Sequence, residues 1–176
     1  MIKALESVAE AEFLPPEFIR GEVAAGRVVI PGNRNRPSVR ALGVGRALRT
    51  KINVNLGNSP LTGHSATELA KLRCAVNAGA DTVMDLSTGS DADEIRRRIL
   101  DASPVPVGTV PIYQAVGMVD EIADLTPEHL IQVIEHQARQ GVDFMTIHAG
   151  LLRAQLPAAK RRLLGIVSRG GSILAQ

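Results

Sequence analysis

Polar side chains that could bind a ligand fall where the predicted strands of this chain end. An amide, a phenol and an imidazole supply directional hydrogen bonds, and a glycine-rich turn supplies backbone N–H groups suited to phosphate. Each residue alone has a structural explanation, such as a turn cap or a satisfied core histidine. Because the carboxyl ends of barrel strands share one rim, the set together predicts a binding site. Its members are Asn55, Met84, Asp85, Tyr113, His148 and the turn Ser168-Arg169-Gly170-Gly171.

Alternating strands and helices would position these residues. Strands are predicted over residues 51–56, 81–87, 104–113 and 144–150. Two segments between them repeat one design, because Gly79-Ala80-Asp81 and Gly141-Val142-Asp143 each join a helix-ending glycine to an aspartate and a strand. Their spacing is about two β/α units of ~30 residues each.

The helices between the strands have recognisable ends and buried stripes. Ser65 and Glu68 form a capping-box pattern at the start of one helix, and Thr126-Pro127-Glu128 starts another. Ser90 could cap a third, in which Ile95 and Ile99 face inward. The three arginines of that helix are predicted to lie mostly outside; they are Arg96, Arg97 and Arg98. A further helix is predicted around residues 157–164.

Such alternation predicts either an open doubly wound sheet or a barrel. Candidate residues follow several strands rather than one switch point, which favours a (β/α)8 TIM-type barrel. A complete barrel needs ~250 residues, and this chain has 176. We therefore expect residues 51–176 to supply roughly the first half of a barrel.

Residues 1–50 are predicted to form a leader with a short helix at 17–25, a strand at 27–31 and a loop at 32–49. Gly43-Val44-Gly45 lacks the third glycine of a nucleotide-binding loop, because Leu48 stands in its place. Basic residues cluster here. They form either a solvated loop or a field that attracts a phosphorylated ligand, and they are Arg34, Arg36, Arg40, Arg46, Arg49 and Lys51.

Composition narrows the class of protein. The chain is 45% hydrophobic and only 2% aromatic, which suits parallel strands packed from aliphatic residues. A net charge of +2 is too balanced to indicate nucleic acid. The single cysteine, Cys74, excludes an internal disulfide and is predicted to be a small buried hydrophobe. Without a signal peptide or an apolar run of ~20 residues, no membrane is expected and the predicted location is cytoplasmic.

Longer strings carry a resemblance to a known family. They are Lys51-Ile52-Asn53-Val54-Asn55-Leu56-Gly57-Asn58-Ser59, Gly79-Ala80-Asp81-Thr82-Val83-Met84-Asp85-Leu86-Ser87-Thr88-Gly89, the segment from Ser103 to Ala115, Thr146-Ile147-His148-Ala149-Gly150 and Gly165-Ile166-Val167-Ser168-Arg169-Gly170-Gly171-Ser172. In this order, from about Ile19 to the last residues, the chain resembles the phosphomethylpyrimidine synthase family.

The resemblance implies a (β/α)8 barrel that rearranges 5-aminoimidazole ribotide into the hydroxymethylpyrimidine phosphate of thiamin. The family uses a [4Fe-4S] cluster to cleave S-adenosylmethionine into a 5′-deoxyadenosyl radical, and it also binds zinc. Substrate contacts carried over by matching motif are Asn55, Met84, Tyr113, His148, Ser168, Arg169 and Gly170. Residues 168–170 would face the phosphate, and Asn55, Tyr113 and His148 would face the imidazole and ribose.

This chain also departs from the family pattern. The family's zinc histidines and its Cys-x2-Cys-x4-Cys cluster motif lie beyond the Ser-Arg-Gly-Gly turn, and no residue here corresponds to them. A half barrel would leave strand edges unpaired, so a homo-oligomer or a missing C-terminal half is expected.

Three alternatives to the thiamin enzyme remain open. One is a non-catalytic half barrel that binds the ribotide. Another is the sister enzyme that makes 5-hydroxybenzimidazole from the same ribotide. The third is a sugar-phosphate barrel enzyme that uses acid–base chemistry at Asp85 and His148.

Overall fold

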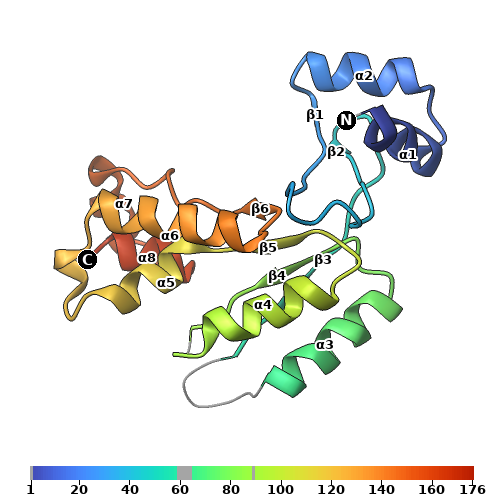
Figure 1. Ribbon diagram of the computed structural model, residues 1–176. Coiled ribbons are helices and arrows are strands. Elements are labelled where there is room, and N and C mark those ends of the chain that lie inside the picture. Colours follow the sequence, from blue (N-terminus) through green and yellow to red (C-terminus); the bar gives the residue numbers. More distant parts are fainter. Residues whose placement is uncertain (1, 59–64, 89) are drawn as a thin grey trace.

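A parallel sheet forms the centre of the computed structural model, which describes residues 2–58, 65–88 and 90–176 (Figure 1). Its strand order is β3-β4-β5-β6, and every neighbouring pair is parallel. The strands are β3 (Asn53–Leu56), β4 (Thr82–Asp85), β5 (Val107–Thr109) and β6 (Phe144–Met145). The predicted α/β class is confirmed. The described residues form an open sheet, so the closed barrel stays a prediction.

Helices connect the strands, as parallel pairing requires. They are α3 (Ser65–Asn77), α4 (Ala92–Ala102), α5 (Pro111–Ala115) and α6 (Pro127–Gln140). Short 3-10 turns at Val116–Met118 and Ile122–Asp124 lie between α5 and α6. The chain ends in a 3-10 turn at Arg153–Gln155, α7 (Leu156–Lys160) and α8 (Arg169–Leu174). Over the described residues, none of the helices is long and apolar enough to cross a membrane.

Successive strand residues point to opposite faces of the sheet, and the two faces differ in character. The face covered by α3 and α4 is apolar, because Leu56, Val83 and Val107 pack there against Leu72 and Ile99. Burial of such side chains contributes about 1.5–3 kcal/mol each. Ile95 and Ile99 face inward on α4 as predicted.

The ends of α6 follow the local sequence signals. Pro127 occupies the first turn, and the N–H of Thr126 donates to Nδ1 of His129 at 3.2 Å. Gly141 ends the helix with a φ of 112°, a conformation that glycine adopts without strain. For α3, the side chain of Ser65 in the predicted capping box lies outside the described residues. The buried carboxylate of Glu68 accepts a hydrogen bond from the N–H of Gly57 at 2.8 Å.

The residues before β3 form a small unit with a hydrophobic core of its own. Two helices, α1 (Ile2–Glu12) and α2 (Pro16–Ala24), pack through Leu5, Val8 and Ile19, above an antiparallel pair of β1 (Val28–Val29) and β2 (Val44–Gly45). The predicted helix at 17–25 is α2. The prediction missed α1, and β2 lies inside the segment predicted to be a loop. The domain division at residue 50 stays a prediction.

The two repeated aspartates hold the amino ends of the strands. Asp81 accepts a hydrogen bond from the N–H of Ile52 at 2.8 Å and pairs with Arg49. Asp143 accepts one from the N–H of Val107 at 2.8 Å and pairs with Arg36. Each carboxylate thus joins its own strand to the preceding one and binds an arginine of the basic loop.

Three predicted elements differ from the structure, which changes where site residues lie. The strand predicted to reach Tyr113 is only β5, because Pro111 lacks the N–H that a strand needs and starts α5 instead. The strand predicted for 144–150 is only β6, so His148 lies in the loop after it. The predicted turn at Ser168 is the start of α8, where Oγ of Ser168 accepts from the N–H of Gly171 at 3.2 Å.

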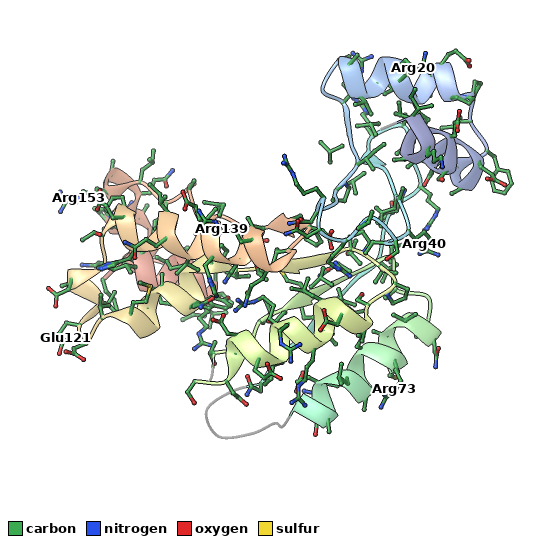
Figure 2. The ribbon with its side chains drawn as sticks, viewed as in Figure 1. Arg20, Arg40, Arg73, Glu121, Arg139 and Arg153 are labelled. Carbon is green, nitrogen blue, oxygen red and sulfur yellow. The ribbon has the colours of Figure 1, made fainter. Side chains whose placement is uncertain are left out.

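Three predictions about single residues on α3 and α4 are wrong. Cys74 was predicted to be buried, but it is exposed on the outer side of α3. Arg96 was predicted to lie outside, but it is 2% exposed because Asp85 of β4 and Asp93 of its own helix bind it. Helix α4 begins after Asp91 rather than Ser90. Other arginines, such as Arg73 on α3, do project into solvent (Figure 2).

Candidate functional site

The sheet face opposite the apolar core carries polar side chains along β3 and apolar ones, such as Met84 and Phe144, further across. Asn53 and Asn55 of β3 point there, because Val54 and Leu56 between and beside them pack into the core. Asn55 lies directly opposite Met84 in the register of β3 and β4, and Asn53 lies opposite Thr82. Two of the predicted site residues, Asn55 and Met84, therefore share one face.

Hydrogen bonds organise this open face. Oγ1 of Thr82 donates to Oδ1 of Asn53 at 2.9 Å, and Nδ2 of Asn53 donates to Oδ1 of Asn55 at 3.0 Å. Oγ1 of Thr146 lies 3.9 Å from Sδ of Met84. Three residues of this face were not predicted as site residues: Asn53, Thr82 and Thr146. Alternation from Asn55 and Met84 would have found the first two, since they lie two residues earlier on the same strands.

A second group gathers at the carboxyl end of the sheet. Tyr113 comes from α5, His148 from the loop after β6 and Arg169 from the start of α8. The rings of Tyr113 and His148 have centroids 6.5 Å apart, and Cζ of Arg169 lies 5.0 Å from the centroid of the Tyr113 ring. Such a cation–π contact stabilises by about 0.5–1 kcal/mol and orients the guanidinium.

Gly170 lets His148 approach α8 closely. A Cβ at residue 170 would lie 2.3 Å from Cε1 and 2.4 Å from Nε2 of the imidazole, far inside ordinary van der Waals contact of about 3.5–4.0 Å. Nδ1 of His148 is buried and has no hydrogen-bond partner among the described residues. An orphaned buried nitrogen is costly unless a ligand or water completes it.

A cavity of about 410 Å³ lies beside this group. Hydroxyl, carboxylate and amide groups line it, including those of Ser87, Thr88, Asp93, Tyr113 and Gln114. Its position next to Tyr113 extends the polar rim toward the start of α4.

Buried amides anchor α5, which carries Tyr113. Oγ1 of Thr109 donates to Oε1 of Gln137 at 2.7 Å, and Nε2 of Gln137 donates to Oε1 of Gln114 at 2.8 Å. Nε2 of Gln114 donates to Oδ1 of Asp93 at 3.0 Å. These hydrogen bonds tie α5 to β5, α4 and α6. The position of Tyr113 is therefore fixed through the next residue, Gln114.

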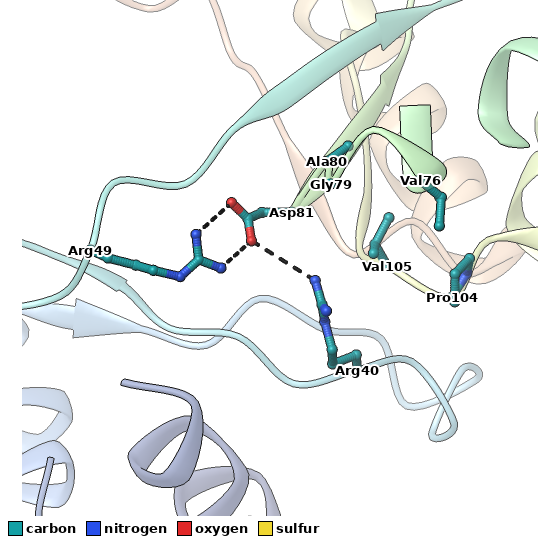
Figure 3. A pocket seen from close by; sticks show the side chains of 8 residues that line it. All are labelled: Arg40, Arg49, Val76, Gly79, Ala80, Asp81, Pro104 and Val105. Atoms are coloured by element: carbon teal, nitrogen blue, oxygen red, sulfur yellow. Dashed lines mark hydrogen bonds and ion pairs between the residues drawn. The ribbon is translucent and has the colours of Figure 1, made fainter. Parts of the chain in front are cut away.

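A different cavity, of about 260 Å³, lies at the amino ends of the strands (Figure 3). Arg40 and Arg49 point into it from the basic loop, but Asp81 binds both. Nη1 of Arg49 lies 3.0 Å from Oδ2 of Asp81, and Nη2 of Arg40 lies 3.8 Å from Oδ1. Burial would raise the pKa of Asp81, yet the hydrogen bonds from Arg49 and Ile52 and the nearby arginines bring that pKa below its usual value. These charges therefore serve to hold the loop rather than to attract a ligand.

Asp85 does not join the open face. It follows Met84 directly, so it points to the helix-covered side, where Nε of Arg96 lies 3.4 Å from Oδ2 and the N–H of Ser87 donates to Oδ1 at 3.0 Å. Burial raises the pKa of Asp85, against the lowering effect of Ser87 and Arg96. An acid–base pair of Asp85 and His148 is therefore not favoured by this geometry.

Comparison with known proteins identifies the family. The sequence model of the radical SAM ThiC family matches residues 1–176. The chain belongs to the radical SAM ThiC family. It is 54% identical over 173 residues to a phosphomethylpyrimidine synthase of Halobacterium salinarum, and 55% identical over 173 residues to one of Natronomonas pharaonis. These matches cover 98% of this chain and 36% of each relative, so the chain spans about a third of their length.

The family name implies S-adenosylmethionine and an iron–sulfur cluster, and the side chains of this ThiC-family chain do not fit such a cluster. A [4Fe-4S] cluster of the radical type needs three thiolates, whereas the sequence has one cysteine. Cys74 is exposed on α3. In the part of the chain that the structure describes, no group of three His, Cys, Asp or Glu side chains could hold a metal ion.

Proposed function

We propose that this chain supplies part of the substrate-binding wall of a phosphomethylpyrimidine synthase, with 5-aminoimidazole ribotide as the ligand. The main support is the cluster of Tyr113, His148, Arg169 and Gly170. These residues come from separate segments of the sequence and meet beside a polar sheet face. Relatives named phosphomethylpyrimidine synthase favour the thiamin product over a benzimidazole.

A division of roles follows from the chemistry of the groups. Arg169, with the hydroxyl of Ser168 beside it, offers a positive charge and a hydrogen-bond donor for the phosphate. Asn55 and the orphaned Nδ1 of His148 offer directional bonds to the imidazole and ribose. Met84 adds a flexible, polarizable surface against which a planar ring can pack.

Radical chemistry would depend on groups held by protein other than these 176 residues, because the cysteine count excludes a cluster here. The strands β3 and β6 each have one strand neighbour in the described sheet. Further strands, from a second copy or from another part of the protein, would close a (β/α)8 barrel and cover the polar face.

Ribotide binding by the isolated chain tests the proposal. Calorimetry should detect binding to the wild type, and Arg169→Ala should weaken it roughly 10-fold or more because a charge-assisted bond to phosphate is lost. Arg20→Ala is the matched control, since Arg20 is an exposed arginine on α2, away from the sheet (Figure 2). Equal affinities of the two variants would contradict the proposed site.

A further inference from the structure

The open face contains a directional ladder of side chains. Thr82 and Asn53 are register partners on β4 and β3, and Asn55 lies two residues further along the same face. Oγ1 of Thr82 donates to Oδ1 of Asn53 at 2.9 Å, and Nδ2 of Asn53 donates to Oδ1 of Asn55 at 3.0 Å. Each step therefore uses an amide oxygen as the acceptor.

The direction of the ladder decides what Asn55 can offer a ligand. An amide has one acceptor oxygen and an NH2 group with two donors. Because Oδ1 of Asn55 is engaged by Asn53, the group left free is Nδ2. The amide of Asn55 would then recognise an acceptor atom, such as an unprotonated ring nitrogen, and reject a donor at the same place.

We propose that Asn53 and Thr82 are positioning residues that fix the amide of Asn55 as a hydrogen-bond donor toward the unprotonated imidazole nitrogen of the ligand. The inference rests on the proposed function for the identity of the ligand. The ladder itself does not, because its bonds lie within the chain. If Asn55 instead donated from Nδ2 to residue 53, its Oδ1 would face the ligand, and a ligand with a hydrogen-bond donor at that place would be favoured.

The substitution Asn53→Asp reverses the direction of the hydrogen bond between residues 53 and 55. A carboxylate is only an acceptor, so Asn55 has to turn Nδ2 toward residue 53 and Oδ1 toward the ligand. Two probes are compared by calorimetry: the ribotide, and a pyrrole ribotide in which a CH replaces the acceptor nitrogen. The added charge weakens both probes through their phosphate, so the ratio of the two dissociation constants isolates the hydrogen bond.

For the wild type, the pyrrole probe should bind roughly 3- to 10-fold more weakly than the ribotide, as one net hydrogen bond predicts. In Asn53→Asp the ratio should fall to about one. Thr82→Val should lower it partly, because the hydroxyl that orients Asn53 is gone. Asn77→Asp, at an exposed position on α3, should keep the wild-type ratio. An unchanged ratio in Asn53→Asp would overturn the inference.

Side-chain amide NMR separates failure of the inference from failure of the proposed function. Without ligand, one Nδ2 proton of Asn53 should show the small temperature coefficient of a hydrogen-bonded proton, while both protons of Asn55 behave as free. In Asn53→Asp a proton of Asn55 should become bonded. A bonded Asn55 proton in the wild type would refute the ladder even if the ribotide binds. A wild type that binds neither probe would refute the ligand and leave the ladder to be decided by these signals.

Discussion

Replacement of Gly170 by alanine tests whether His148 depends on its seat against α8. The new Cβ would lie 2.3 Å from Cε1, 2.4 Å from Nε2 and 2.7 Å from Cδ2 of the imidazole. Ordinary contact requires about 3.5 Å or more, so the ring has to retreat by roughly 1 Å. The backbone at residue 170 is helical, so the substitution strains no dihedral angle.

The expected cost divides between folding and binding. Overpacking costs about 1–3 kcal/mol, and the better helix propensity of alanine contributes about 0.5–1 kcal/mol in the other direction. The free energy of unfolding should therefore fall by at most ~2.5 kcal/mol. Displaced by this distance, the imidazole should lose its bond to the ligand. Ribotide affinity should then fall about 5- to 10-fold.

Calorimetry with the ribotide and a urea denaturation curve measure the two effects separately. Gly32→Ala is the control, because nothing lies within 4 Å of a Cβ at that position; it should change neither quantity appreciably. The combination Gly170→Ala with His148→Ala should bind no more weakly than His148→Ala alone. The reasoning fails if Gly170→Ala keeps full affinity, or if its loss adds to that of His148→Ala.

Two further predictions concern buried polar groups. Gln137→Leu should lower the free energy of unfolding by about 2–4 kcal/mol, because it leaves Thr109 and Gln114 without their partner. The control Gln132→Leu, on the exposed side of α6, should change that free energy little. Similar urea midpoints for the two variants would argue against the network. The pKa of Asp81 is lowered in the fold, so its contribution is present above the unfolded value of about 3.9 and is lost as pH falls through the folded pKa. Asp81→Asn should therefore be less stable than the wild type at neutral pH by about 1–2 kcal/mol, and the difference should shrink below about pH 4; a constant difference across urea curves from pH 3 to 7 would contradict the pKa shift.

The order of strands and helices could be predicted from sequence because their signals are local. Gly141 needs a positive φ and Thr126-Pro127 starts a helix whatever surrounds them, so both ends of α6 were correct. The strand leading to Tyr113 was predicted too long, because alternating Val and Pro read as a strand on both sides of Pro111. The position of His148 against Gly170 could not be predicted, since it depends on where α8 returns to the sheet.

Burial of charge was the hardest feature to predict. Arg96 follows the buried Ile95 on α4 and was expected outside. Partners from β4, α4 and α6 nevertheless converge on it: Asp85, Asp93 and Gln140. None of these contacts follows from spacing along α4 alone, apart from that to Asp93. The apolar periodicity of a helix predicts which face is buried, but it does not predict which charged side chain will be buried against a partner on a neighbouring element.

The basic loop and the rim show how the chain separates two uses of arginine. Arg36 and Arg49 lie near the amino ends of the strands, where the repeated aspartates Asp143 and Asp81 bind them. Charges paired in this way contribute little electrostatic field at the opposite end of the strands, because opposite charges cancel and physiological salt screens exposed charges over about 8–10 Å. At the carboxyl end, Arg169 stacks on the ring of Tyr113, and no carboxylate pairs with it among the described residues. A cation held by an aromatic face keeps its hydrogen-bond donors free for an anion. Pairing at the amino ends therefore stabilises the fold, and stacking at the carboxyl end would leave Arg169 available for the phosphate of the proposed ligand.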